Sequence, residues 1–260
     1  MRNRRAIYAL LSLLVAVGFY LYENYNPQSV TIVSIEGFNY LPTSTTGQII
    51  QHKNYSLSYN ELYEQAEWVA YELNNLHLTY DDRKRPYFIN DPKVITGSAN
   101  YKNYKKSGYD RGHLCPAGDR RYTKEAYDET FFTSNITPQR NNFNAGVWNR
   151  LEIKTRYWAK KYKRLYIVTG GILNKDLPTI GYEDVAVPKY FYKIILDYTE
   201  PEIKAIAFLF PHEESKSHLS NFIVPIDTLE KLTNIDFFPN LPDDIESKLE
   251  AKSSSKGWKF

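Results

Sequence analysis

Residues 109–114 (YDRGHL) place a carboxylate, a guanidinium and an imidazole within four positions, and the interpretation of the chain starts from them. In an extended strand Arg111 and His113 point to the same face, and Gly112 between them lets the backbone approach a ligand closely. An imidazole removes a proton from water near neutral pH, and a guanidinium stabilises negative charge on phosphate oxygens. The stretch therefore predicts a strand suited to phosphate chemistry. A buried structural histidine is an equally open interpretation of His113 taken alone.

Directly downstream, the sequence predicts a second strand, a polar turn and a helix. Residues 130–135 (TFFTSN) are rich in β-branched and aromatic side chains, and residues 144–162 carry apolar side chains at helical spacing. On that helix Asn144 and Glu152 can both lean toward the strand of His113. A carboxamide oxygen is a hard ligand that suits Mg²⁺. A helix cap is the alternative interpretation of Asn144.

The remaining segments predict an α+β domain with a mostly antiparallel central sheet flanked by helices. Four of them have the composition of strands: residues 55–59, 165–169, 190–198 and 203–210. Helical spacing of apolar side chains is found over residues 60–73 (NELYEQAEWVAYEL), and residues 226–232 fit a short helix. Strands and helices without a regular alternation are typical of the α+β class.

Composition and charge narrow the functional classes. The chain has 260 residues, 42% hydrophobic and 15% aromatic, which is enough to close a core. Its net charge is only +3, but from Arg83 to Arg164 there are 19 Lys and Arg against 7 Asp and Glu, a local +12. Such a block favours a polyanion such as nucleic acid, with scattered surface lysines as the alternative. The single cysteine, Cys115, excludes an intramolecular disulfide and a Cys-based metal site, and is interpreted as a small buried side chain.

The N-terminus has the pattern of an export signal. Three arginines within the first five residues precede the uncharged run 6–22 (AIYALLSLLVAVGFYLY). As a helix this run is about 26 Å long, just short of a bilayer core. No small-residue cleavage site closes it, so an uncleaved signal anchor is favoured over a cleaved signal peptide. The positive-inside rule then places the protein outside the cytoplasm, anchored in the membrane, or periplasmic or secreted if the signal is cleaved.

These observations divide the chain into four parts. Residues 1–22 are the signal anchor or signal peptide, and residues 23–50 are a polar linker in which residues 30–35 are a candidate strand. Residues 51–245 form the domain. Residues 246–260 are a polar tail whose end is expected to fray.

Three blocks of sequence follow one another within about 43 residues. They are Asp110-Arg111-Gly112-His113, then Ser134-Asn135-Ile136-Thr137-Pro138-Gln139, then Asn144-x-x-x-Trp148-x-x-Leu151-Glu152. In this order they resemble the DNA/RNA non-specific endonucleases of the ββα-metal, or His-Me finger, class, which are relatives of mitochondrial endonuclease G. A looser likeness extends over most of the chain outside the N-terminal run. The resemblance implies that the α+β domain carries a ββα-metal finger as its active site.

The resemblance also implies a role for each matching residue. His113 matches the family's general base, which activates a water for attack on the phosphodiester. Asn144 matches its single direct protein ligand to Mg²⁺, for which Mn²⁺ is a substitute. Arg111 matches the arginine that contacts the phosphate, and Glu152 matches the carboxylate that holds metal-bound water. Asn135 matches a supporting asparagine near the catalytic site.

Four further residues are expected to contribute to substrate binding: Arg85, Asp110, Lys105 and Lys106. Arg85 is chosen as the family's second phosphate-binding arginine because an aromatic residue and Asp-Pro follow it, and Arg83 is the alternative. Asp110 is expected to orient the turn of the motif. The two lysines lie among tyrosines at positions 101, 104 and 109, a mixture that suits base stacking and phosphate contacts.

The sequence therefore predicts a Mg²⁺-dependent, sugar-non-specific endonuclease that hydrolyses DNA and RNA with water activated by His113. Low sequence preference follows if contacts go to phosphate and sugar. One alternative is a catalytically weak nucleic-acid-binding or uptake module at the cell surface, against which the presence of both His113 and Asn144 argues. Another is a phosphoesterase for small substrates, with little sensitivity to salt. The expected partners are DNA, RNA and, through the N-terminal helix, the membrane. The sequence leaves open whether the protein forms a homodimer and whether an inhibitor protein binds it.

Overall fold

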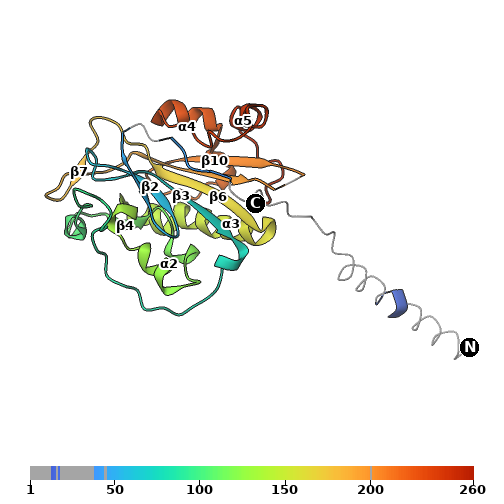
Figure 1. Ribbon diagram of the computed structural model, residues 1–260, viewed down its shortest axis with the longest axis horizontal. Coiled ribbons are helices and arrows are strands. Elements are labelled where there is room, and N and C mark those ends of the chain that lie inside the picture. Colours follow the sequence, from blue (N-terminus) through green and yellow to red (C-terminus); the bar gives the residue numbers. More distant parts are fainter. Residues whose placement is uncertain (1–12, 16, 18–37, 44–45, 200) are drawn as a thin grey trace, which may run out of the picture. The chain divides into compact units, whose positions relative to one another are not determined.

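Seven strands form the central sheet, in the order β1-β2-β3-β6-β9-β10-β11 (Figure 1). Their bounds are β1 (Gln48–Gln51), β2 (Ser56–Asn60), β3 (Gln65–Asn74), β6 (Arg164–Gly171), β9 (Tyr190–Asp197), β10 (Lys204–Pro211) and β11 (Ile223–Val224). Every neighbouring pair is antiparallel. The predicted α+β class with an antiparallel sheet is therefore confirmed. Four of the predicted strands correspond to β2, β6, β9 and β10.

The structure is a computed structural model that describes residues 13–15, 17, 38–43, 46–199 and 201–260. All the strands and helices named here belong to the unit formed by residues 37–260. The predicted signal or anchor helix over residues 1–22 lies outside the described residues, apart from residues 13–15 and 17, and so does the candidate strand over residues 30–35. Within the described part of the chain, no helix is both long enough and apolar enough to cross a membrane.

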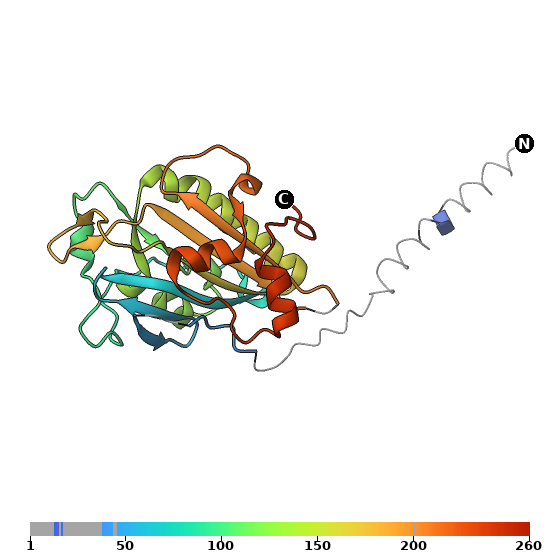
Figure 2. The same cartoon turned by 90° about the horizontal axis from the view of Figure 1, so that it is seen from above.

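Helices cover both faces of the sheet. On one face lie α2 (Lys124–Glu129) and α3 (Asn149–Tyr162), and on the other lie α4 (Ile226–Thr233) and α5 (Asp243–Glu250) (Figures 1 and 2). Successive side chains of a strand point to opposite faces. In β9, Phe191 and Ile195 accordingly join the core beneath α3, whereas Tyr192 and Ile194 join the core beneath α4. The strands are thus buried on both sides.

Short elements complete the domain. They are η1 (Asn75–His77), η2 (Tyr101–Tyr104), β4 (Asp110–His113), η3 (Ala117–Asp119), η4 (Thr133–Asn135), β5 (Ile136–Gln139), η5 (Phe143–Trp148), β7 (Thr179–Ile180), β8 (Val185–Ala186) and η6 (Leu219–Phe222). The strands β4 and β5 form a separate two-stranded antiparallel sheet on the same side as α3.

The helix predicted over residues 60–73 is wrong, because a tight turn and the central strand β3 occupy this range. Glu64 adopts a positive φ of 54° in the turn, after which β3 pairs with both β2 and β6. A strand buried on both faces shows no alternation of polar and apolar residues. The Ala and Glu residues of β3, which have high helix propensity, therefore led to the prediction of a helix. The buried carboxylate of Glu67 is tolerated because it accepts hydrogen bonds from Ser58 Oγ (2.7 Å) and Thr46 Oγ1 (2.8 Å).

The second strand of the predicted strand-turn-strand unit lies later than expected. Residues 130–135 end α2 and form the 3-10 turn η4, and the strand is β5, in the segment where a polar turn was predicted. A proline lacks the N–H that a central strand needs, but β5 has a partner on one side alone. Pro138 can therefore sit in this strand without losing a ladder hydrogen bond.

The chain after Lys252, which was expected to fray, packs against α3. Trp258 is 5% exposed, and its ring centroid lies 4.8 Å from that of Trp158. Trp158 Nε1 donates to the carbonyl of Lys259 (2.7 Å), and the Tyr162 hydroxyl donates to the carbonyl of Gly257 (2.6 Å). The C-terminal residues therefore close the outer side of the core beneath α3.

We expect Trp258→Ala to lower the free energy of unfolding by about 3 kcal/mol, because it removes a buried aromatic side chain and leaves a cavity. Lys256→Ala, at an exposed position two residues away, should change it by about 0.5 kcal/mol or less. Urea titration followed by circular dichroism measures both. Equal stability of the two variants would mean that the C-terminal residues do not pack in solution.

Candidate active site

The strands β4 and β5 and the helix α3 follow one another as a ββα unit. The register sets His113 opposite Ile136 and Gly112 opposite Thr137. A Cβ atom at Gly112 would lie 2.2 Å from the side chain of Gln139, so a larger residue would have to displace this buried side chain. In the structure Gly112 therefore makes room for Gln139.

A kink separates Asn144 from the regular part of the helix. The predicted helix over residues 144–162 consists of the π-helical turn η5 followed by α3, and Gly146 between them has non-helical dihedral angles (φ −96°, ψ −110°). Departures from regular α-helical geometry are frequent at functional sites. Here the kink lets Asn144 and Glu152 line the same cleft although they lie on different helical segments.

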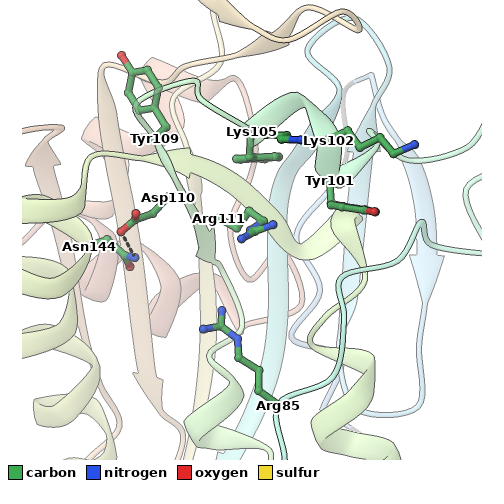
Figure 3. Close-up of a pocket in the computed structure, with 9 residues that line it drawn as sticks. Arg85, Tyr101, Lys102, Lys105, Tyr109, Asp110, Arg111 and Asn144 are labelled. Carbon is green, nitrogen blue, oxygen red and sulfur yellow. Dashed lines mark hydrogen bonds between the residues drawn. The ribbon is translucent and has the colours of Figure 1, made fainter.

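Two adjoining hollows collect most of the residues selected from the sequence. The first, of about 470 Å³ and called the central cleft here, is lined by His113, Asn144, Glu152 and Arg85, among others. The second, of about 580 Å³, is lined by Arg111, Asp110, Lys105, Lys102, Tyr101, Tyr104 and Tyr109, together with the shared residues Arg85 and Asn144 (Figure 3). The structure therefore brings together seven of the nine residues: Arg85, Lys105, Asp110, Arg111, His113, Asn144 and Glu152.

Asp110 fixes the orientation of the Asn144 amide. Asn144 Nδ2 donates to Asp110 Oδ2 over 3.1 Å, and Asn141 Nδ2 donates to the same oxygen, also over 3.1 Å (Figure 3). No described residue donates a hydrogen bond to Asn144 Oδ1. Asp110 thus holds the nitrogen of this amide and leaves its oxygen available to a ligand.

His113 is an unprotonated imidazole in an aromatic surround. Its ring centroid lies 5.1 Å from that of Phe131 and 5.7 Å from that of Phe88. Burial, assisted by the positive charge of Arg85, lowers the pKa of His113 to about 3. Its Nε2 atom is buried without a hydrogen-bond partner among the described residues. At neutral pH the ring is therefore uncharged.

Arg85 is held in the cleft by aromatic contacts and not by an acid. Its guanidinium carbon lies 5.2 Å from the ring centroid of Phe88 and 5.4 Å from that of Phe131. Among the described residues it has no ion-pair partner, whereas Arg83 pairs with Asp81 over 2.6 Å. The uncompensated charge favours Arg85 over Arg83 as the phosphate-binding arginine.

A buried hydrogen-bonded pair fastens the loop that follows Arg85. His52 Nε2 and Asp91 Oδ2 are 2.7 Å apart, and Ser134 Oγ donates to the same carboxylate oxygen. Although burial acts against it, the hydrogen bonds from His52 and Ser134 hold the pKa of Asp91 below its usual value. Asp91 therefore ties this loop to His52, directly after β1, and to Ser134 in η4, and His52 has a structural role.

Glu152 belongs to a charged group beneath the cleft that the sequence analysis did not detect. Burial raises the pKa of Glu152 to about 7, although the charge of Lys193 acts in the opposite direction. Arg156 Nη1 lies 2.9 Å from Asp119 Oδ1 and 3.8 Å from Glu152 Oε2. The spacing of four residues between Glu152 and Arg156 was a sequence signal for this pair.

Lys193 is a fully buried lysine on β9. Its Nζ has no hydrogen-bond partner among the described residues and lies 4.9 Å from the ring centroid of Trp148. Burial lowers the pKa of Lys193, and the charges of Glu152 and Asp119 oppose this shift. A single lysine among apolar and aromatic residues, in a strand that ends at Asp197 (YFYKIILD), was the available sequence signal.

Asn135 and Lys106 lie outside both hollows. Asn135 is completely buried, where its Nδ2 donates to the carbonyls of Cys115 and Thr130 and its Oδ1 accepts from the amide of Cys115. It supports the end of β4 and does not reach the cleft. Lys106 is exposed in a turn, with φ of 60°. Cys115 is buried as expected, and burial raises the pKa of its thiol to about 12.

His212 connects β10 to the segment that carries Asn144. Its Nε2 accepts from the backbone amide of Arg140 (2.7 Å), and its Nδ1 then donates to the carbonyl of Pro188 (2.8 Å). Both nitrogens are satisfied in the neutral form, and burial lowers the pKa of His212 to about 4. The 72 residues between Arg140 and His212 explain why the sequence showed no partner.

One group of three acidic residues lies apart from the cleft, on the face covered by α4 and α5. The carboxylate oxygens of Asp227, Glu230 and Glu250 lie within 4.8 Å of one another. Glu230 Oε1 accepts from the backbone amide of Phe237. This group shares no residue with the hollows around His113.

The family model of the DNA/RNA non-specific endonucleases matches residues 38–244, which include the whole ββα unit. The chain belongs to this family. Nuclease EXOG, mitochondrial, of Danio rerio is 35% identical over 207 residues, which are 73% of this chain and 60% of that protein. Endonuclease G, mitochondrial, of Homo sapiens is 32% identical, over 75% of this chain and 70% of that protein. The chain thus spans about 60% of the length of the first relative.

A solved structure shares the fold. The crystal structure of the EndoG/EndoGI complex superposes with a TM-score of 0.71 and 29% sequence identity, over 77% of this chain and 89% of that chain. In that complex EndoG is inhibited. Membership of the family confirms the resemblance found in the three sequence blocks and the assignment to the endonucleases, a class of hydrolases.

The expected location, exported and outside the cytoplasm with a membrane anchor, is wrong by these comparisons. Several relatives that match, including the mitochondrial nuclease of Saccharomyces cerevisiae, are named as mitochondrial proteins. An arginine-rich start followed by an apolar run had been interpreted as an export signal from residues 1–22 alone.

Because the pKa of His212 is about 4 in the folded protein and about 6.5 when unfolded, its neutral form stabilises the fold above pH 6.5. This contribution is lost as the pH falls from about 6.5 to about 4. His212→Gln keeps a donor and an acceptor but does not titrate. We expect the wild type to lose on the order of 1 kcal/mol more than this variant over that range, after allowance for solvent screening.

Urea titrations at several pH values measure this difference, with His218→Gln, at an exposed histidine, as the control. Parallel stability profiles for the wild type and His212→Gln would show that His212 is not held neutral in the fold.

Proposed function

We propose that the protein is a Mg²⁺-dependent, sugar-non-specific endonuclease that hydrolyses phosphodiester bonds in DNA and RNA. The observation that carries the proposal is the convergence of the unprotonated His113 and the free oxygen of Asn144 on one cleft. Membership of the family supports the reaction class. A module that only binds nucleic acid needs neither a proton acceptor nor a free carboxamide oxygen at that place.

The oxygen atoms in the cleft suit a hard divalent cation. Asn144 Oδ1 would hold Mg²⁺ directly and the carboxylate of Glu152 would hold it through water, and Mn²⁺, which also prefers oxygen ligands, is a substitute. When bound, the ion would supply positive charge beside the phosphate and stabilise the leaving 3′ oxygen. Asp110 contributes by keeping the amide of Asn144 turned so that its oxygen faces the ligand.

His113 acts as the general base of the proposed reaction. It accepts a proton from water while the water oxygen bonds to phosphorus and the bond from phosphorus to the 3′ oxygen breaks. Arg111 and Arg85 neutralise the charge that develops on the non-bridging oxygens. Both arginines line the hollow of Figure 3, and Arg85 also lines the central cleft together with His113.

The remaining residues support binding or position the catalytic groups. Lys105 lines the hollow next to Arg111 and would contact a neighbouring phosphate, whereas Lys106 lines neither hollow and has no role in the proposal. Asn135 would act as a positioning residue through the backbone of Cys115. Contacts of this kind go to phosphate and sugar, which is consistent with low sequence preference.

His113→Ala should lower the rate of cleavage of plasmid DNA and of RNA by on the order of 10²-fold or more, because the proton acceptor is lost. Cleavage should also stop when a chelator removes divalent cations, and should return on addition of Mg²⁺. Gel electrophoresis of both polymers over time measures the rates. The matched control is His218→Ala, at an exposed histidine outside the described hollows.

Retention of nucleic acid in a gel-shift assay without cleavage by the wild type would contradict the proposal in favour of a binding module. Full activity of His113→Ala, in protein that remains folded, would contradict the role of His113.

Arg85→Ala should raise the pKa of His113, because it removes a positive charge that disfavours the protonated ring. The acid limb of the profile of kcat/KM against pH should therefore move to higher pH. Arg85→Lys keeps the charge and should leave the acid limb near its wild-type position. An acid limb that shifts equally in the two variants would contradict the electrostatic effect of Arg85 on His113.

A further inference from the structure

A third hollow adjoins the central cleft on the side away from the hollow drawn in Figure 3. It has a volume of about 500 Å³ and shares Gly118, Arg121 and Arg156 with the central cleft. Its other lining residues are Leu78, Thr79, Tyr80, Ile153, Tyr157 and Lys160, from the chain after η1 and from the outer side of α3. The three hollows therefore form a row, with the cleft of His113 in the middle.

Exposed aromatic side chains line this third hollow. Tyr80 is 87% exposed and Tyr157 is 47% exposed, and Ile153 between them in the lining is 55% exposed. Large apolar side chains gathered around one hollow, and not covered by the protein itself, mark a binding site. Neither tyrosine belongs to the residues selected from the sequence, and neither contacts His113 in the central cleft.

Cations accompany both rings. The guanidinium carbon of Arg121 lies 5.9 Å from the ring centroid of Tyr80, and Lys154 Nζ lies 4.9 Å from that of Tyr157. Arg121 forms no ion pair among the described residues, since its hydrogen bond goes to the carbonyl of Asp81. Lys160 adds a further positive charge, and no acidic residue lines the hollow. Aromatic faces beside uncompensated cations are the combination that binds single-stranded nucleic acid.

We propose that the hollow of Tyr80 and Tyr157 is a subsite that stacks unpaired nucleobases of the strand whose phosphate lies at His113. The proposal rests on the proposed nuclease function, and it adds a contact to the bases. Stacking on an aromatic ring is tolerant of sequence because every base has a π face. Bases in a duplex are already stacked and paired, so the subsite acts on single-stranded substrates and on frayed or nicked ends.

The test measures binding in the presence of a chelator, so that its result does not depend on cleavage. Two fluorescently labelled ligands are compared by anisotropy at one fixed salt concentration: a thymidine strand of about twelve nucleotides and an abasic phosphodiester strand of the same length. The proteins are the wild type, the double variant Tyr80→Ala with Tyr157→Ala, and Tyr190→Ala. Tyr190 is 45% exposed, like Tyr157, and lines none of the three hollows.

The wild type and Tyr190→Ala should bind the thymidine strand roughly tenfold or more tightly than the abasic strand, from stacking on the two rings. The double variant should lose this preference and bind both strands as the wild type binds the abasic one. A double variant that keeps the preference, or loses affinity for both strands equally, would overturn the subsite. Failure of the nuclease proposal would appear separately, as absence of cleavage with Mg²⁺ while base-dependent binding persists.

Discussion

The close packing of β4 against β5 is the constraint on which the site depends. Gly112 leaves no space for a Cβ atom beside the buried side chain of Gln139, and the ladder sets Gly112 opposite Thr137. That register places Asp110 at the start of β4 and His113 at its end. The hydrogen bond from Asn144 to Asp110 then joins the strand pair to the helical segment that follows. The segments that carry the candidate general base His113 and the candidate metal ligand Asn144 are thereby joined.

The buried ionisable groups beneath the cleft lower the stability of the fold. A buried cation is expensive unless it is paired or hydrogen-bonded, and Lys193 has no hydrogen-bond partner among the described residues. The charge that most opposes the lowering of the pKa of Lys193 is the carboxylate of Glu152. The pKa of Glu152 is itself raised to about 7 by burial. Groups with strongly shifted pKa values gather at functional sites, where the arrangement of charge serves chemistry and not the packing of the core. The cleft of His113 fits this pattern.

The sequence predicted the parts of the structure that depend on local patterns. The strands β6 and β9 are rich in β-branched and aromatic residues, and Asn144 and Glu152 line one cleft with His113, although a kink at Gly146 divides the single helix that their spacing had indicated. The strand β3 was missed because a strand buried on both faces loses the alternation that identifies it. His212 and Lys193 were missed because their partners are distant in the chain, at Arg140 and Glu152. Long-range pairing of this kind leaves no periodic signal in a single sequence.

The most direct test of the central claim is a titration with Mn²⁺ followed by nuclear magnetic resonance of histidine ring signals. The account predicts that the paramagnetic ion broadens the signal of His113 first, and that Asn144→Ala abolishes this effect at the same Mn²⁺ concentration. The signal of His218, at an exposed position, should change little in either protein. Broadening that leaves His113 unaffected, with the ion instead at Asp227, Glu230 and Glu250, would contradict the assignment of the cleft as the metal site.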